Sequence, residues 1–125
     1  MSILVFLLKA VIGVVIIFFA LVVIHFFFPL LQVVGSSMYP TYKDGEYLRG
    51  MRFYPKNRLR EGDVIAYYRK EEKRVVIKRI AKIMPGNKLY CLGDNAAESY
   101  DSRYYGSVPM KRLVCRVFDQ REKEV

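Results

Sequence analysis

The first quarter of the chain is almost continuously apolar, whereas the rest alternates between short apolar runs and polar turns. Residues 3–31 contain only two ionisable side chains, Lys9 and His25. About 20 helical residues cross the hydrocarbon core of a bilayer, which is roughly 30 Å thick. The pattern therefore predicts one membrane-spanning helix at about residues 9–28, ending before Pro29 because proline disfavours the α conformation in the residue before it. A cleaved signal peptide is the alternative, but this run is too long and ends in bulky phenylalanines.

Beyond the apolar run, five short segments rich in β-branched and aromatic residues follow one another, separated by turn signals. No helical period of any length lies between them, so the pattern is typical of an all-β domain rather than of βαβ units. We predict a mainly β fold, with a membrane anchor at residues 1–31 and one compact β domain at 32–125. The charged tail DQREKEV is expected to fray. The five segments are residues 46–54, 63–70, 74–84, 88–93 and 112–118.

A long polar segment, residues 93–109, precedes the last of these runs. Connections longer than about 12–15 residues are uncommon in small domains and are often functional. Asp101 and Arg103 lie in this segment at a spacing that allows them to pair across a tight turn. The segment is therefore a candidate part of the functional site.

Charge adds a second prediction about the membrane. Lys9 is the only basic residue before position 32, so the β domain carries 20 of the 21 lysines and arginines and all 12 acidic residues, a net charge of +8. Anionic headgroups attract such a domain by about 1 kcal/mol per basic residue near the surface. No recognition helix or aromatic-basic stacking motif accompanies the charge, so we predict no nucleic-acid partner. Lys9 before the helix and Lys43 after it slightly favour a cytoplasmic N-terminus and an exported domain.

The cysteines and the histidine do not predict a metal site or a cofactor. Cys91 and Cys115 lack the spacing of metal ligands, and His25 lies in the apolar run, far from both. An exported domain permits a disulfide between the two cysteines. Whether they are bonded stays open, because a disulfide depends on a geometry that the sequence does not contain.

Two adjacent serines, Ser36 and Ser37, follow the apolar run, and no histidine lies downstream to activate either of them. A lysine can replace histidine as the base when it is neutral, and burial lowers a lysine pKa by several units. In the run RVVIKRIAKI, Lys78 shares one strand face with Val76 and Ile80. From this pattern Lys78 is either an exposed lysine on a two-faced strand or a buried base.

Four segments, in this order, resemble the motifs of type I signal peptidases, the membrane-bound serine proteases that remove signal peptides from exported proteins. In that family the serine directly before methionine is the nucleophile, which points to Ser37. The lysine of the VIKRI segment is the general base, which points to Lys78. The four segments are GSSMYPT at 35–41, GDVIAY at 62–67, VIKRI at 76–80 and LGDNAAESYDSRYYGSVP at 92–109.

The resemblance implies further roles around the two catalytic residues. The backbone N–H of Ser37 is expected in the oxyanion hole, where some members add a serine hydroxyl at the position of Gly35. Met38 is expected near the pocket for the substrate residue before the cut. Ser99 is expected to orient Lys78. Asp101 and Arg103 match a buried salt bridge beside the site, and Gly93, Asp94 and Asn95 match parts of the same wall.

One residue departs from the family pattern. Glu98 stands where asparagine is common, next to Ser99. A carboxylate close to Lys78 would favour the ammonium form and raise its pKa.

As a whole, the resemblance implies an endopeptidase of the cytoplasmic membrane with its catalytic domain on the outer face. Its partners would be signal-peptide-bearing preproteins, anionic lipid and the neighbouring secretion translocon, and it would need no cofactor. Two alternatives stay open, a non-proteolytic accessory protein of pilus or secretion-system assembly and a peptidase dedicated to one substrate. The presence of both Ser37 and Lys78 argues against the first.

Overall fold

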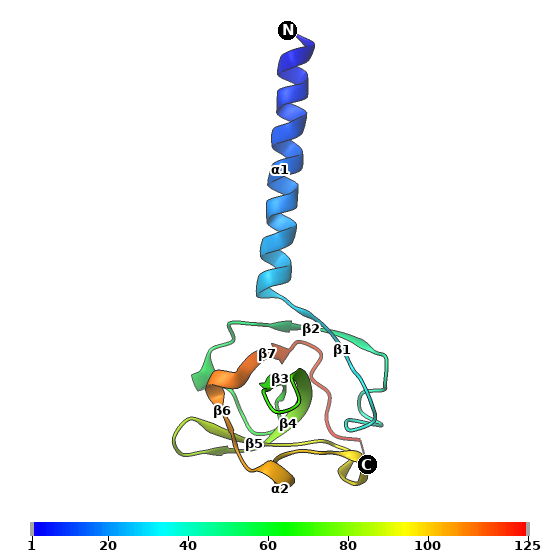
Figure 1. The fold of residues 1–125 in the computed structure, drawn as a ribbon, viewed down its shortest axis with the longest axis vertical. Helices are drawn as coiled ribbons and strands as arrows, with labels where there is room; N and C mark the ends of the chain where they lie inside the picture. The colour runs from blue at the N-terminus through cyan, green and yellow to red at the C-terminus, as the bar shows by residue number, and fades with distance from the viewer. Residues whose placement is uncertain (1, 125) are drawn as a thin grey trace.

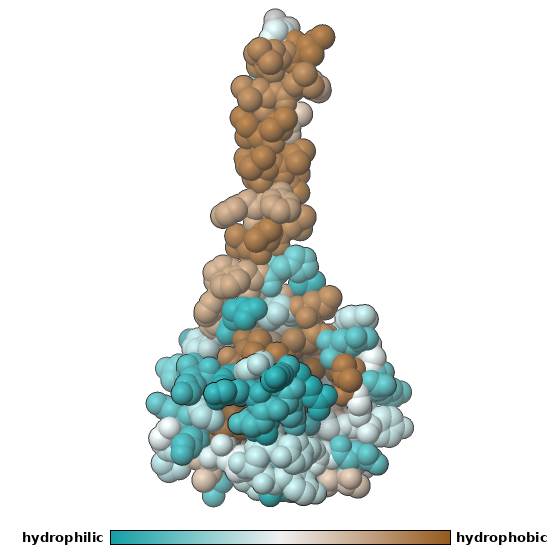
Figure 2. Space-filling view, viewed as in Figure 1, coloured by the Kyte–Doolittle hydropathy of each residue, from teal (hydrophilic) through white to brown (hydrophobic). Residues whose placement is uncertain are grey.

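The computed structural model describes residues 2–124, and its first element is a long helix that stands apart from a β domain (Figure 1). Helix α1 spans Ile3–Phe27, none of its residues is buried, and it is apolar and long enough to cross a membrane. Its apolar surface is continuous over most of its length (Figure 2). The helix begins earlier than predicted because Ser2 caps it, accepting a hydrogen bond from the N–H of Val5 at 3.3 Å, and because lysine is a good helix former that does not interrupt it at Lys9.

Two arginines of the domain form hydrogen bonds with the C-terminal end of α1. The last carbonyls of a helix have no partner within it. Arg49 Nη1 donates to the carbonyl of Phe28 at 2.8 Å, and Arg52 Nε donates to that of Phe26 at 2.6 Å. The ring of Phe53 packs against Phe26 at a centroid distance of 5.8 Å. The helix ends just before Pro29, as predicted.

The domain is built on one antiparallel sheet of seven strands in the order β1-β2-β7-β3-β4-β5-β6, which confirms the mainly β prediction. The sheet curls so that β3 and β4 lie near its centre (Figure 1). The strands are β1 (Leu30–Gln32), β2 (Tyr47–Met51), β3 (Val64–Arg69), β4 (Arg74–Met84), β5 (Lys88–Leu92), β6 (Val108–Pro109) and β7 (Leu113–Val117).

Short helical turns complete the domain, and three of them lie around the long polar segment between β5 and β7. Helix α2 begins directly after Asp101, whose side chain caps it by accepting from the N–H of Arg103 at 3.1 Å. The segment predicted as a long loop is therefore ordered by its own polar side chains. The turns are η1 (Lys56–Arg58), η2 (Ala96–Glu98), α2 (Ser102–Tyr105) and η3 (Met110–Arg112).

Two apolar clusters occupy opposite faces of β3. Val64 and Ala66 point into one cluster, and Ile65 and Tyr67 into the other, as the alternation of a strand requires. Cys115 belongs to the first cluster and Cys91 to the second, and both are buried free thiols.

The C-terminal tail is packed against the domain as far as Glu124, so the prediction that it frays is wrong for residues 119–124, while residue 125 lies outside the described residues. The side-chain amide of Gln120 accepts from the N–H of Val64 at 2.7 Å and donates to the carbonyl of the same residue at 2.8 Å. It also donates to the carbonyl of Val117 at 2.6 Å. A polar tail gains order in this way when its side chains complete the hydrogen bonds of a strand.

Candidate active site

The loop after β1 places Ser37 in a tight turn. The N–H of Tyr39 donates to the carbonyl of Ser36 at 3.1 Å, and that of Tyr42 donates to the carbonyl of Met38 at 2.9 Å. Asn95 holds the turn from the other side, because its N–H donates to the carbonyl of Ser37 at 2.8 Å and its side chain to that of Ser36 at 3.0 Å. The serine is therefore held through its backbone while its hydroxyl stays available.

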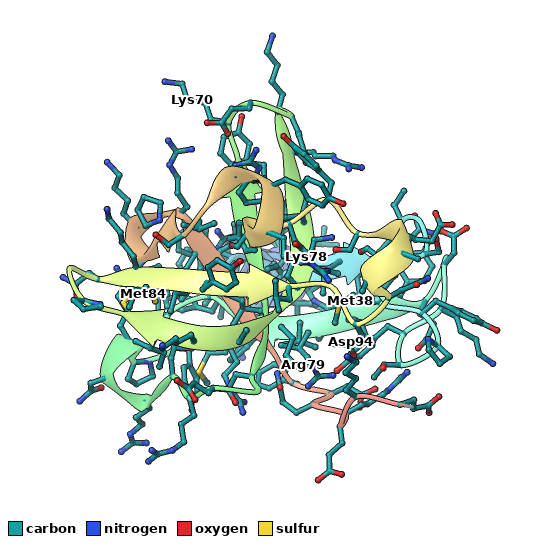
Figure 3. The ribbon with its side chains drawn as sticks, turned by 90° about the horizontal axis from the view of Figure 1, so that it is seen from below. Met38, Lys70, Lys78, Arg79, Met84 and Asp94 are labelled. Atoms are coloured by element: carbon teal, nitrogen blue, oxygen red, sulfur yellow. The ribbon has the colours of Figure 1, made fainter. Side chains whose placement is uncertain are left out.

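Lys78 reaches the same point from β4. Its Nζ atom lies 2.8 Å from the Oγ of Ser37, and the residue is only 5% exposed. Val76 and Ile80, on the same strand face, are buried as well. The alternative of an exposed lysine is therefore wrong. Figure 3 shows Lys78 beside Met38, which follows the serine and is also buried.

Burial lowers the pKa of Lys78 below that of an ordinary lysine, because desolvation penalises the ammonium form. The nearby carboxylates of Asp101 and Glu72 act in the opposite direction. The sequence left the effect of Glu98 on Lys78 open, and the carboxylates with the largest effect are these two, while Glu98 is exposed. No sequence motif pointed to Glu72, which the turn between β3 and β4 brings back toward the site.

Asp101 is the centre of a buried hydrogen-bond network. Its carboxylate accepts from Ser99 Oγ at 2.6 Å, from the N–H of Gly93 at 2.9 Å and from Arg103 Nε at 2.9 Å. Burial alone would raise the pKa of Asp101, but these hydrogen bonds outweigh it and hold the pKa well below its usual range. The carboxylate is thus a fixed negative charge behind the site.

The expected pairing of Asp101 with Arg103 is present, although only the aspartate is buried, since the arginine side chain is 34% exposed. Ser99 donates its hydroxyl hydrogen to Asp101, and no hydrogen bond within residues 2–124 joins it to Lys78. The role of Ser99 in orienting the lysine therefore stays a prediction.

A second ion pair, which the sequence did not suggest, holds the segment Gly93–Asn95 that follows β5. It joins Asp94 of this segment to Arg79 of β4. Arg79 holds Asp94 through two hydrogen bonds, Nε to Oδ1 at 2.9 Å and Nη2 to Oδ2 at 2.8 Å (Figure 3). Asp94 in turn donates its N–H to the sulfur of Met38 at 3.4 Å. Arg79 follows Lys78 directly, so the two side chains point to opposite faces of the strand. One strand, β4, thus positions both Lys78 and, through Arg79, the segment that contains Asp94.

A cleft of about 400 Å³ leads away from Ser37 and Lys78 between residues 32–36, which begin with the last residue of β1, and residues 74–78 of β4. β4 pairs with β5 only from Arg79 onward, so within the described chain residues 74–78 have a sheet partner on one side only. The other side of this stretch faces the cleft.

Comparison with known proteins identifies the family of the chain. A family model described as "Signal peptidase, peptidase S26" matches residues 6–87 and 81–119. The chain belongs to this family. The matched stretches contain Ser37, Lys78 and the Asp101 network, and the resemblance inferred from four motifs is confirmed. Membership in the signal peptidase family indicates peptidase activity and, as the substrate class, proteins that bear signal peptides. A comparison with curated proteins found no match.

Proposed function

We propose that the protein is a serine endopeptidase that removes signal peptides from exported preproteins with a Ser37–Lys78 dyad. The observation that carries the proposal is the 2.8 Å separation of Ser37 Oγ and Lys78 Nζ, at a buried lysine. Serine needs a base to attack an amide, and an amine whose pKa is lowered can accept the proton at this distance.

In this mechanism Ser37 Oγ attacks the scissile carbonyl carbon while Lys78 accepts the hydroxyl proton. The carbon–nitrogen bond then breaks, and Lys78 gives the proton to the departing amine, which leaves an ester on the serine. Lys78 next takes a proton from water, whose oxygen attacks the ester carbonyl carbon. The bond between this carbon and Ser37 Oγ then breaks, Lys78 returns the proton to Oγ, and the signal peptide leaves with a free carboxylate. Serine and lysine return to their starting states, so the reaction consumes only water.

The oxyanion of each tetrahedral intermediate is assigned to the backbone N–H of Ser37. No hydrogen bond within residues 2–124 uses this N–H, so it is free to donate. Gly35 has no side chain to add a second donor. Removing one such donor lowers the rate by about 10²–10³-fold in other proteases. The turn that fixes the N–H of Ser37 is therefore expected to contribute directly to the rate.

The cleft suits an extended peptide. One of its walls is the extended half of β4 that ends at Lys78, and this half has one unpaired edge within the described chain. An extended chain adds to such an edge by main-chain hydrogen bonds, with alternate side chains entering pockets. The buried Met38 at the serine end is assigned to the pocket for the residue before the cut.

The same proposal places α1 across the cytoplasmic membrane with the β domain on its outer face, beside the translocon. Apolar surface continues from the helix onto the adjoining part of the domain (Figure 2). Phe53 packs against Phe27, the last residue of the helix, and Phe118 against Phe28, which follows it; the two residues are 59% and 50% exposed. Aromatic side chains suit the membrane interface, and Arg49 and Arg52 beside them suit anionic headgroups.

The orientation has a direct test in thiol labelling. Cys91 and Cys115 are buried, and burial raises their thiol pKa values to about 12 and about 11, so the parent protein should not react. Lys70→Cys, at the exposed turn after β3, should react with an impermeant maleimide added to intact cells. Ser2→Cys should react only after the cells are permeabilised. The reverse pattern would place the domain in the cytoplasm.

The activity itself is tested with a preprotein that carries an Ala-x-Ala cleavage site, incubated with the detergent-solubilised full chain. We expect one cut after the second alanine, identified by the new N-terminus of the mature product. A folded protein that leaves several such preproteins intact would favour the accessory role instead.

A further inference from the structure

The C-terminal segment 119–124 is packed under the loop that carries the nucleophile, a contact between residues about 80 positions apart. Thr41 and Tyr42, which end the turn that begins at Ser37, are both buried. The hydroxyl of Tyr42 donates to the carbonyl of Asp119 at 2.5 Å and accepts from the N–H of Arg121 at 3.1 Å. The tail and the loop are thus joined through one buried phenol.

Arg121 makes most of the remaining contacts. Its Nη1 donates to the carbonyl of Thr41 at 2.8 Å, and its guanidinium carbon lies 4.6 Å from the ring centroid of Tyr42. Its Nη2 donates to Glu46 at 2.8 Å and to Asp119 at 2.7 Å. A planar fork can satisfy several acceptors while stacking on a ring, which an ammonium group cannot do.

Glu46 connects the arginine to the segment that follows β1 and leads into the nucleophile loop. It accepts from the N–H of Lys43 at 2.8 Å, and its own carbonyl accepts from the N–H of Val33 at 2.8 Å. Val33 lies four residues before Ser37. Arg121 therefore reaches both arms of the nucleophile loop, the one that enters it through Val33 and the one that leaves it through Thr41.

We propose that Arg121 is a positioning residue that holds the nucleophile loop in register with Lys78. Asn95 fixes the loop on one side through the carbonyls of Ser36 and Ser37, and Arg121 fixes it on the other. Arg121 touches neither Ser37 nor Lys78 in the described chain, so it acts through the backbone. The inference rests on the proposed function, because it assigns a role in the same reaction.

Arg121→Ala should lower kcat for preprotein cleavage about 10-fold while KM stays within about twofold, because a displaced nucleophile slows the chemical step and leaves the cleft intact. Arg121→Lys should recover part of the loss, since it keeps the ion pair with Glu46 but not the fork. Added guanidinium ion should partly restore Arg121→Ala. Tyr42→Phe, which removes only the hydroxyl, should lower kcat in the same direction. Glu122→Ala is the matched control in the tail, because Glu122 is exposed.

A purely structural role would lower the melting temperature without changing the kcat of the folded protein, and that result would overturn the inference. A second measurement does not depend on catalysis. Amide hydrogen exchange at residues 38–42 should speed up in Arg121→Ala and stay unchanged in Glu122→Ala. Unchanged exchange in Arg121→Ala would also overturn the inference. Loss of cleavage in wild type would instead count against the proposed function, and the exchange result would still decide the role of Arg121.

Discussion

Lys78→Met is expected to lower the rate of preprotein cleavage by about 10²–10⁴-fold, the usual contribution of a general base. Methionine fills the buried site with an apolar chain of similar length, so the fold should survive while the proton acceptor is lost. Ser37→Ala should abolish acyl-enzyme formation and reduce the rate to background. In wild type, activity should rise with pH as Lys78 deprotonates, with a midpoint below the usual lysine pKa of 10.5 because burial lowers it.

Substitutions of the acidic residues around Lys78 test whether the midpoint of the pH–rate profile reports the pKa of this lysine. Glu72 raises the pKa of Lys78, so Glu72→Gln should move the midpoint of the pH–rate profile further down. Glu98→Asn should move it less, because Glu98 is exposed. Activity that survives Lys78→Met would show that Lys78 is not the general base. A midpoint that responds to Glu98 but not to Glu72 would contradict the electrostatic account.

Gly93→Ala is expected to lower both activity and stability, because no space exists for a methyl group at this position. A Cβ on Gly93 would overlap the Oγ of Ser99 and lie 2.6 Å from the carbonyl oxygen of Ser37. Relief requires that the nucleophile turn or the Asp101 network moves. Forcing an extra methyl group into a packed site costs about 1–3 kcal/mol, and a shift of the nucleophile by 1 Å can cost about 10²-fold in rate.

Gly50→Ala is the matched control. A Cβ there would lie 2.5 Å from the sulfur of Cys115 and 2.8 Å from the carbonyl oxygen of Arg116, so it should cost stability as well. Gly50 contacts the core on the β7 side of the sheet, away from the Ser37–Lys78 pair. We expect both variants to melt at lower temperature, measured by circular dichroism, and only Gly93→Ala to lower kcat. Equal kcat losses in the two variants would show a general effect of misfolding.

The sequence alone was sufficient for features that depend on local chemistry. The apolar run predicted α1 because its side chains suit lipid over more than a bilayer thickness, and its end followed from Pro29. The strand at 74–84 was predicted with its observed bounds, because a run rich in β-branched residues ends at a Pro-Gly-Asn turn. The motifs also singled out Ser37 and Lys78, which the fold brings within 2.8 Å across 41 positions.

Short elements without a periodic signal were missed. β1 reads as a continuation of the apolar anchor and β6 contains only two residues, so both exist through pairing with β2 and β5 rather than through propensity. Such pairing depends on partners far along the chain, and no local pattern encodes it.

The tertiary structure decided the electrostatics of the site and the order of the tail. The pattern allowed Lys78 to be exposed or buried, and only the packing around it removes water and lowers its pKa. The sequence raised Glu98 as a candidate acidic neighbour and left its effect open, and the fold places Glu72 and Asp101 to act on the lysine. Arg121 reads as part of a solvated charged tail and is instead bonded to a loop 80 positions earlier. Desolvation and long-range hydrogen bonds depend on which surfaces meet, so they arise only once the sheet has closed.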